Sequence, residues 1–390
     1  MARTGTLLPL LALWACPPAV PAWDKDGHEA IGMTAMSALE QHTVAQVKRL
    51  MHGKDAADVA AWAHKVNKKY PWTSELHFQR QPANRCTSKE MMRKPADLSH
   101  CTDNRCIVKA LKHFYGRLVN KQIVDLKWPD GIQLKDADAV KFLINLIGDL
   151  HQPLHFGTES DDLGRNITVI FRGKKYSLYD MWDRVITETI MQDTPGFWWG
   201  GWTHVQRTRV EYEKDGAQWK KEGAVLFEHW ADETARYVCD SVYRNPLTGR
   251  SIHDEIQDGV FKLDDSLYEL WKREMLSKML VAGARTAIVL NSILQQREAE
   301  NLQGGTAVSG VEPEEEEDRP KVPQGGRRAD AAHILHTGTG ARLGAMAGLI
   351  NLGIFFVVLI IFLQVMRMWL GKDAVTQADR AKRSEGGKKI

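Results

Sequence analysis

The sequence of 390 residues has little excess charge and none of the simplest nucleotide-binding patterns. Its formal net charge is only +3 at pH 7, so no overall positive field attracts nucleic acid, and such binding needs a local site. The chain contains neither an internal repeat nor a glycine-rich phosphate loop, and glycine and proline mainly separate its segments. Tryptophan, by contrast, is frequent at 13 residues, and these rings can pack the core of a large helical domain.

Cysteine is also scarce, with five residues in the chain. Cys16 belongs to a predicted signal peptide, which leaves an even number, as is typical of an oxidising compartment. Because no two of the remaining cysteines have the two-residue spacing of a four-cysteine zinc site, disulfides are favoured. Three pairings are possible. Cys101 and Cys106 are close enough for a small loop, which would leave Cys86 with Cys239.

Residues 1–22 have the pattern of a secretory signal peptide. Arg3 gives the positive start, residues 7–14 give the apolar core, and residues 20–22 form a small-residue cleavage site. The apolar core is too short to span a bilayer, which argues against a membrane anchor at this end. Cleavage at the predicted site would make Trp23 the mature N-terminus.

A longer hydrophobic segment near the other end predicts a single membrane crossing. Residues 343–366 have the length of a transmembrane helix, and the basic tail at residues 367–390 favours a cytosolic C-terminus. Residues 301–342 are rich in acidic residues, glycine and proline, and they predict a disordered stalk. The folded part is therefore expected to be one ectodomain, residues 23–300, of a single-pass type I membrane protein, on the lumenal or extracellular side.

Hydrophobic periodicity predicts an all-α ectodomain with one small β-hairpin. An apolar spacing near 3.6 residues recurs in four segments: residues 30–39, 139–150, 223–238 and 267–295. Residues 167–171 and 175–178 instead indicate two short strands that turn near Gly173.

The most informative motif is the run GDLHQPLH at residues 148–155, which ends the second of these helices. It places Asp149, His151 and His155 beside an apolar stretch, and carboxylate and imidazole near an apolar wall are what a zinc site requires. A capped helix end is the alternative interpretation. Asn145 and Asp149 are four residues apart, hence on one helix face, and the same spacing separates Tyr179 from Asp183. The further residues of this type are His28, His64, His77, Tyr179 and Asp183.

Together, these motifs resemble the S1/P1 nuclease family over residues 23–294. The matching features are Trp23-x4-His28, Trp62-Ala63, Leu76-His77-Phe78, the run at 148–155, Trp182-Asp183 and residues 282–291. The cysteine spacing is also similar to the two disulfides of the family, Cys86–Cys239 and Cys101–Cys106. The resemblance implies a helical, zinc-dependent enzyme that degrades single-stranded nucleic acids.

The family binds three zinc ions, and the resemblance implies ligands for each of them. Trp23 would bind one ion through its free amine and carbonyl oxygen, together with His28 and Asp149, so the signal must be removed first. The implied ligands of the second ion are His64, His77, Asn145 and Asp149. The implied ligands of the third ion are His155, Tyr179 and Asp183. His151 is common in the family but is not usually a ligand, and the ring of Phe78 would stack on a base.

Five positions depart from the family pattern. His64 stands where the family usually has Asp, and Asn145 and Tyr179 stand where it usually has His. Asn67 takes the place of a phosphate-binding Arg, and Arg80 takes that of a base-reading Asp. The family balances its ions with three Asp residues, whereas this chain keeps two of them, so ionised Tyr179 would restore the third negative charge. Because an amide oxygen is a weak zinc donor, the first site is expected to fill most readily and the second site least.

The leading hypothesis is a metal-dependent phosphodiesterase that hydrolyses single-stranded DNA or RNA, or 3′-nucleotides, with Asp149 orienting a metal-activated water. One alternative is a catalytically impaired, membrane-tethered binding module. The other is a zinc-dependent phospholipase C, although Phe78 after His77 favours the nuclease pattern. The candidates to replace the missing Arg are Lys65, Lys68 and Lys69.

Asn166 begins a glycosylation sequon, which suits a secretory route. It lies in Gly164-Arg165-Asn166, where the family often has Gly-Gly-Asn near the site. A glycan at Asn166 would therefore hinder access of a substrate.

Overall fold

The computed structural model describes residues 23–99, 101–129, 132, 134–194 and 205–304. The predicted signal peptide, residues 305–342 of the predicted stalk, the predicted membrane segment at residues 343–366 and the basic tail lie outside these ranges. Among the residues that are described, no helix has the length and apolar character needed to cross a bilayer.

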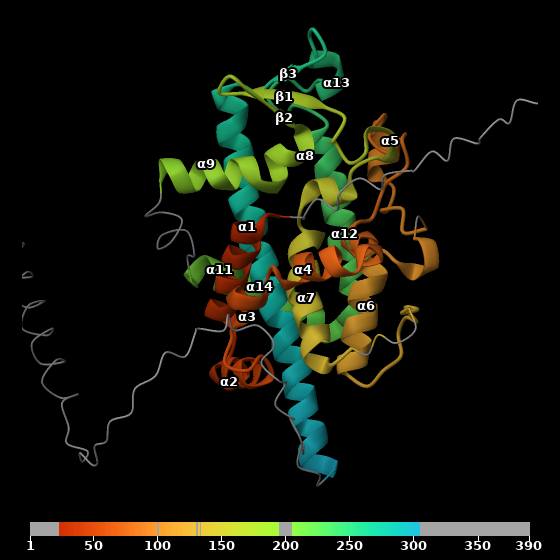
Figure 1. Cartoon of the computed structure of the whole chain (residues 1–390), viewed down its shortest axis with the longest axis vertical. Coiled ribbons are helices and arrows are strands. Elements are labelled where there is room, and N and C mark those ends of the chain that lie inside the picture. Colours follow the sequence, from red (N-terminus) through yellow and green to blue (C-terminus); the bar gives the residue numbers. More distant parts are fainter. Residues whose placement is uncertain (1–22, 100, 130–131, 133, 195–204, 305–390) are drawn as a thin grey trace, which may run out of the picture. The chain divides into compact units, whose positions relative to one another are not determined.

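The described part is mostly helical, as the periodicity predicts (Figure 1). The α-helices are α1 (Lys25–Ala38), α2 (Gln41–Leu50), α3 (Ala56–Val59), α4 (Trp62–Lys69), α5 (Lys89–Arg93), α6 (Ile107–Leu118), α7 (Asp136–Leu150), α8 (Leu178–Asp180), α9 (Ile186–Asp193), α11 (Val205–Glu222), α12 (Leu226–Tyr237), α13 (Ile252–Glu255) and α14 (Asp265–Gly304). Short 3₁₀ segments include Pro71–His77, Pro153–Phe156 and Gly223–Val225, and single π-helical turns lie at Met181–Val185 and Val238–Val242.

Helix α7 runs through the middle of the bundle, and its residues from Ala139 onwards are largely buried on every side. Helices α6 and α14 pack along it, and α1 packs against α14 (Figure 1). This last contact is close, because a Cβ at Gly283 of α14 would lie 2.5 Å from the side chain of Thr34 of α1. The four predicted helices are all present. Helix α1 begins earlier than predicted, at Lys25, because the side chain of Asp24 caps its first turn.

The predicted hairpin is confirmed as strands β1 (Thr168–Phe171) and β2 (Lys174–Ser177), which pair antiparallel. Both turn residues, Arg172 and Gly173, have positive φ, which matches the right-handed twist of a tight hairpin. A third strand, β3 (Phe261–Lys262), adds in parallel to β1 and was not predicted. The described domain is therefore helical with a small three-stranded sheet of order β2-β1-β3.

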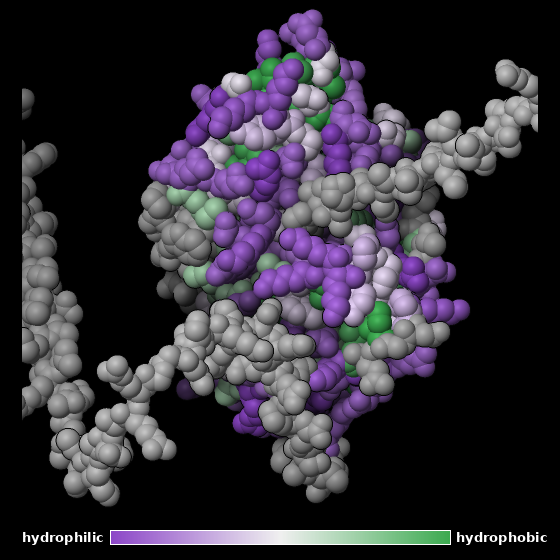
Figure 2. All heavy atoms as spheres, in the orientation of Figure 1, coloured by the Kyte–Doolittle hydropathy of each residue, from purple (hydrophilic) through white to green (hydrophobic). Residues whose placement is uncertain are grey.

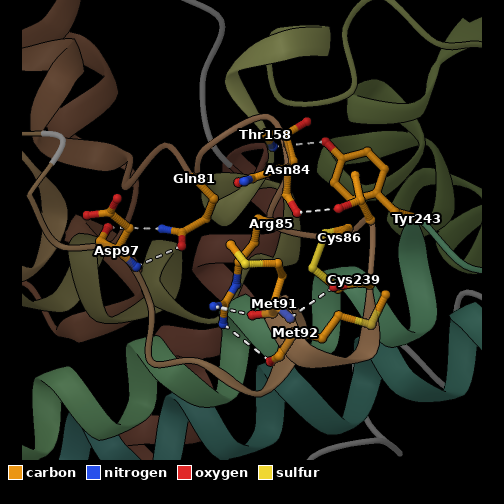
Figure 3. The surroundings of a disulfide bond; sticks show 12 residues. Gln81, Asn84, Arg85, Cys86, Met91, Met92, Asp97, Thr158, Cys239 and Tyr243 are labelled. Atoms are coloured by element: carbon orange, nitrogen blue, oxygen red, sulfur yellow. Dashed lines mark hydrogen bonds between the residues drawn. A yellow bond between two sulfur atoms is a disulfide. The ribbon is translucent and has the colours of Figure 1, made fainter.

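Both expected disulfides are present. Cys86 pairs with Cys239 in the second π-helical turn, and Cys101 pairs with Cys106 just before α6. Figure 3 shows the first bond beside Arg85, whose guanidinium donates to the backbone carbonyls of the segment around α5. Disulfides of this kind are consistent with the secretory pathway.

The two disulfides are expected to contribute unequally to stability. The Cys86–Cys239 bond joins residues 153 positions apart, whereas Cys101–Cys106 joins residues 5 positions apart. Loop-closure entropy predicts stabilisation of about 5 kcal/mol for the long loop and about 2 kcal/mol for the short one. Paired Cys→Ser variants, compared by chemical denaturation, should show the larger loss for Cys86–Cys239. Equal losses would contradict this prediction.

The surface of the described domain is largely hydrophilic on the face shown in Figure 2, with small, scattered apolar areas. Most large apolar side chains belong instead to one core cluster within residues 23–294. The domain therefore has its own hydrophobic core, and this core includes the residues of α7 on either side of the predicted ligands Asn145 and Asp149.

Candidate functional site

Asp149 is the centre of the candidate site. It lies in the last turn of α7, and its side chain is fully buried. His77, at the end of a 3₁₀ segment, places Nδ1 2.6 Å from the carboxylate oxygen Oδ2, and His28 of α1 places Nε2 3.1 Å from Oδ1. The first contact is a hydrogen bond, whereas Oδ1 has no aligned donor among the described residues. Three segments that are distant in sequence thus meet at one buried carboxylate.

The predicted N-terminal residue, Trp23, is anchored next to this carboxylate. Its indole Nε1 donates to the carbonyl oxygen of Gly148 at 2.9 Å, and its side chain is buried. Asp24 accepts hydrogen bonds from the first turn of α1 and so fixes the start of the helix that carries His28. Gly148 permits this close approach, because a Cβ there would lie 3.0 Å from Nδ1 of His28.

His77 is held from both sides of its ring. Nδ2 of Asn67 lies 3.0 Å from Nε2, and the hydroxyl of Thr73 donates to Oδ1 of Asn67 at 2.5 Å. Nδ1 then carries the proton that it donates to Asp149. Asn67, which stands in place of the expected phosphate-binding Arg, is therefore a buried positioning residue for His77.

His64 and Asn145 face the same space. The ring centroid of His64 lies 4.9 Å from that of His28 and 5.8 Å from that of His77. Nδ2 of Asn145 donates to the carbonyl oxygen of Ala60 at 2.8 Å. Within the described residues, both ring nitrogens of His64 and Oδ1 of Asn145 are buried without a hydrogen-bond partner. Because unpaired buried polar atoms are costly, their gathering at one point indicates a site for a ligand.

His155, Tyr179 and Asp183 form a second group beside the first. Nδ1 of His155 donates to the carbonyl oxygen of His77 at 2.6 Å, and Nε2 lies 3.2 Å from the hydroxyl of Tyr179. Asp183 lies in a π-helical turn, which is rare and frequently occurs at functional sites. Its carbonyl accepts from the backbone N–H of Asp24 at 3.0 Å, and its Oδ1 is buried without a partner in the described part of the chain.

Burial and crowding of carboxylates shift the charge states of this centre. Burial, followed by the charges of Asp24 and Asp149, raises the pKa of Asp183 well above its usual range. Burial and then Asp183 likewise raise the pKa of Tyr179, which opposes its expected ionisation. Burial also acts to raise the pKa of Asp149, but the two neighbouring imidazoles outweigh it and hold that pKa well below the usual range. Buried, crowded carboxylates favour a bound cation.

Two histidines of the centre, His64 and His155, are kept neutral. Burial, followed by the charge of His28, lowers the pKa of His64 well below its usual range. Burial also lowers the pKa of His155 to about 3. The neutral imidazole is the form that binds metal ions.

An aromatic and cationic rim borders the second group. The ring centroid of Phe78 lies 4.6 Å from that of His155, and Phe78 is 9% exposed. The guanidinium of Arg165 lies 3.9 Å from the ring centroid of Tyr179 and 5.5 Å from that of Phe78. Sequence reasoning did not assign a role to Arg165. The arginine in place of glycine in Gly164-Arg165-Asn166 was the signal that could have identified it.

His151 makes its hydrogen bonds outside the centre. Nδ1 donates to the carbonyl oxygen of Ile147 at 2.7 Å, and Nε2 accepts from Arg285 at 2.9 Å. Arg285 also donates to Asp215, a contact that sequence reasoning missed although Arg285 lies in a matched motif. Asn166, the predicted glycosylation site, is exposed.

Across the described ranges, no three side chains of His, Cys, Asp or Glu are grouped as a metal ion requires. The predicted ligand sets, however, include other donors: the main chain of Trp23, the amide of Asn145 and the phenol of Tyr179. The structure therefore brings the predicted residues together around Asp149 and beside it, with the altered positions among them.

Comparison with known proteins agrees with the sequence motifs. Residues 23–295 match the family described as S1/P1 Nuclease. Endonuclease 4 of Arabidopsis thaliana is 27% identical over 290 residues, which cover 70% of this chain and 90% of that protein. Nuclease S1 of Aspergillus oryzae is 28% identical over 177 residues, or 43% of this chain and 55% of that protein. Nuclease P1 of Penicillium citrinum is 22% identical over 179 residues, or 43% and 60% respectively.

Proposed function

Because the chain belongs to the S1/P1 nuclease family, we propose that it hydrolyses phosphodiester bonds of single-stranded DNA or RNA, or of 3′-nucleotides, with bound zinc. The observation that carries this proposal is that His28 lies 3.1 Å from the buried carboxylate of Asp149, next to the anchored Trp23, while His155 and Tyr179 lie together beside it. Imidazole beside a buried carboxylate is a donor pair that suits zinc.

The first donor set consists of Trp23, His28 and Asp149. Two ligands of one tetrahedral zinc ion, each at about 2.0–2.1 Å, lie about 3.3 Å apart. Nε2 of His28 and Oδ1 of Asp149 are 3.1 Å apart, which is close to the separation of two ligands of one ion. A free amine at Trp23 would add a further donor from the start of α1.

The residues implied for the third ion, which are His155, Tyr179 and Asp183, form the second donor set. Nε2 of His155 and the hydroxyl of Tyr179 are 3.2 Å apart, and the unpaired Oδ1 of Asp183 becomes an anionic donor once a cation displaces the proton of that carboxyl. We expect this set to bind zinc less tightly, because Tyr179 is neutral until a cation displaces its proton.

The third donor set is the one implied for the second ion, around His64 and Asn145. This set fits zinc poorly. His77 uses one ring nitrogen on Asp149 at 2.6 Å and the other on Asn67 at 3.0 Å, so neither nitrogen is presented to an ion. What remains is the imidazole of His64 and an amide oxygen, which is a weak zinc donor. The proposed enzyme therefore relies on the first two sets.

Each residue then has a definite part in hydrolysis. Zinc, when bound, supplies a Lewis acid that activates water near neutral pH. Asp149 orients the attacking water and keeps His28 in place, and Phe78 stacks on a base of the strand. Water adds to phosphorus in line with the 3′-oxygen, the bond from phosphorus to that oxygen breaks, and the proton lost by the water goes to the leaving oxygen. A strand then gives a 3′-hydroxyl and a 5′-phosphate, and a 3′-nucleotide gives a nucleoside and inorganic phosphate. Because Phe78 offers only a flat face, little base preference is expected from this contact.

The N-terminus provides the sharpest test. The full-length protein, produced through a secretory route and purified in mild detergent, should begin at Trp23, contain zinc and hydrolyse single-stranded DNA. A matched protein with one extra alanine before Trp23 has no free amine at that position, so both zinc content and rate should fall. Zinc content is measured by atomic absorption and hydrolysis with an oligonucleotide. A correctly cleaved protein that holds no zinc and does not hydrolyse DNA would refute the proposal.

A binding module without hydrolysis is the second candidate. It is favoured by Asn145 and Tyr179 at predicted ligand positions, together with the absence of a three-ligand His, Cys, Asp or Glu group in the described ranges. In the same experiment, this candidate predicts binding of single-stranded DNA by a protein that neither holds zinc nor cleaves the strand.

A further inference from the structure

The chain segment that carries Phe78 presents alternate side chains to opposite sides. Gln79 and Gln81 are buried, and both side-chain amides donate to the carbonyl oxygen of Asp97, at 3.0 and 3.2 Å. Because successive side chains of an extended segment point to opposite sides, Phe78 and Arg80 project together on the other side. Arg80 therefore stands next to the ring that is proposed to stack on a base.

A strained loop brings a second arginine to the same ring. Asp162, Leu163 and Gly164 all have positive φ, at 51°, 62° and 84°. Leucine rarely adopts this conformation, and such strain tends to persist where it serves a function. The result here is that Arg165 reaches over the rings of Tyr179 and Phe78.

The two arginines share one carboxylate. Nη1 of Arg80 lies 2.9 Å from Oδ1 of Asp162, and Nη1 of Arg165 lies 3.6 Å from the same oxygen. Two guanidinium groups and one carboxylate leave a net positive charge. Both arginines also remain partly exposed, at 35% and 21% of their side chains, so their other N–H groups can reach an anion.

We propose that Arg80 and Arg165 form a phosphate clamp beside Phe78, which binds backbone phosphates of the single strand whose base stacks on that ring. The clamp replaces the positive charge that the chain lacks at Asn67, which is buried against His77. The guanidinium of Arg165 lies over the rings of Phe78 and Tyr179, whereas Lys69 of α4, one of the expected replacements, lies over the ring of Tyr70. The substrate class in this inference rests on the proposed function.

Salt dependence of binding tests the clamp independently of hydrolysis. The probe is a fluorescent, phosphorothioate-linked oligothymidylate, which resists cleavage, and the protein is the full-length chain carrying N166Q so that no glycan interferes. For a single strand, each phosphate contact contributes about 0.7 to the slope of log affinity against log salt. R165Q and R80Q should each lower the slope by about that amount and weaken binding about tenfold at low salt. R165K should largely keep the slope.

The matched control is R209Q, which removes an exposed arginine of α11 and should leave both affinity and slope unchanged. An unchanged slope in R165Q and R80Q would overturn the clamp, even if the protein cleaves DNA. Inorganic phosphate that binds as tightly as the oligonucleotide, with the same loss in R165Q, would also overturn it in favour of a site for free phosphate. If the slopes fall as expected in a protein that does not cleave DNA, the clamp stands and the proposed hydrolysis fails.

Discussion

Replacement of Asp149 by asparagine is expected to lower the rate of single-strand hydrolysis by at least about 10²–10³-fold. The carboxylate is fully buried between two imidazoles, whose charges hold its pKa well below the usual range in spite of burial. An amide of the same shape carries no charge, and its N–H₂ group faces either His28 or His77. The measurement is the steady-state rate on single-stranded DNA, together with zinc content.

The matched control for this variant lies on the same helix. Asp138 in the first turn of α7 accepts from the backbone N–H of Lys135, and D138N should cost only a fraction of the helix stability and none of the activity. Whereas D149N removes a metal ligand, Y179H places an imidazole beside His155 in the second donor set, as in the family pattern. Y179H should therefore raise zinc content. If D149N and D138N have equal rates, Asp149 has no part in the reaction.

The helical fold was predictable because its main signal is local. Helices α7 and α14 bury long apolar faces, and a 3.6-residue apolar spacing reveals such faces directly. Helix α11 was missed because it is strongly polar, with charged residues at half of its 18 positions. Strand β3 was missed because two residues carry no periodicity, and their pairing with β1 depends on where the tertiary fold places them.

The candidate ligands could be proposed from sequence as a set of residues but not as a set of contacts. The motif at residues 148–155 pointed to Asp149, His151 and His155, and the family resemblance then selected Asp149 and His155 and added Asn145 and Tyr179. Sequence alone cannot show that both ring nitrogens of His77 are occupied, because Asn67 and Asp149 reach them through the fold. Sequence also cannot show which buried atoms are left without partners, since that depends on packing between helices.

Replacement of Arg285 by methionine is expected to destabilise the domain by about 3–5 kcal/mol, the usual cost of breaking one side of a buried ion pair. The Arg285 side chain is 5% exposed, and Nε donates to the equally buried Asp215 at 2.6 Å. Without Arg285, the carboxylate of Asp215 would remain buried without its partner. A melting temperature lower by about 10 °C is expected, measured by calorimetry.

Two variants separate this ion pair from a general effect of mutating α14. R297M removes an arginine of the same helix whose ion pair with Asp136 is about one-third exposed, so its cost should stay below about 1 kcal/mol. R285M/D215L removes both buried charges and should recover a large part of the loss. Equal losses in R285M and R297M would contradict the prediction. Because Arg285 also donates to His151, the expected large difference would instead show that the buried ion pair beside His151 stabilises the domain.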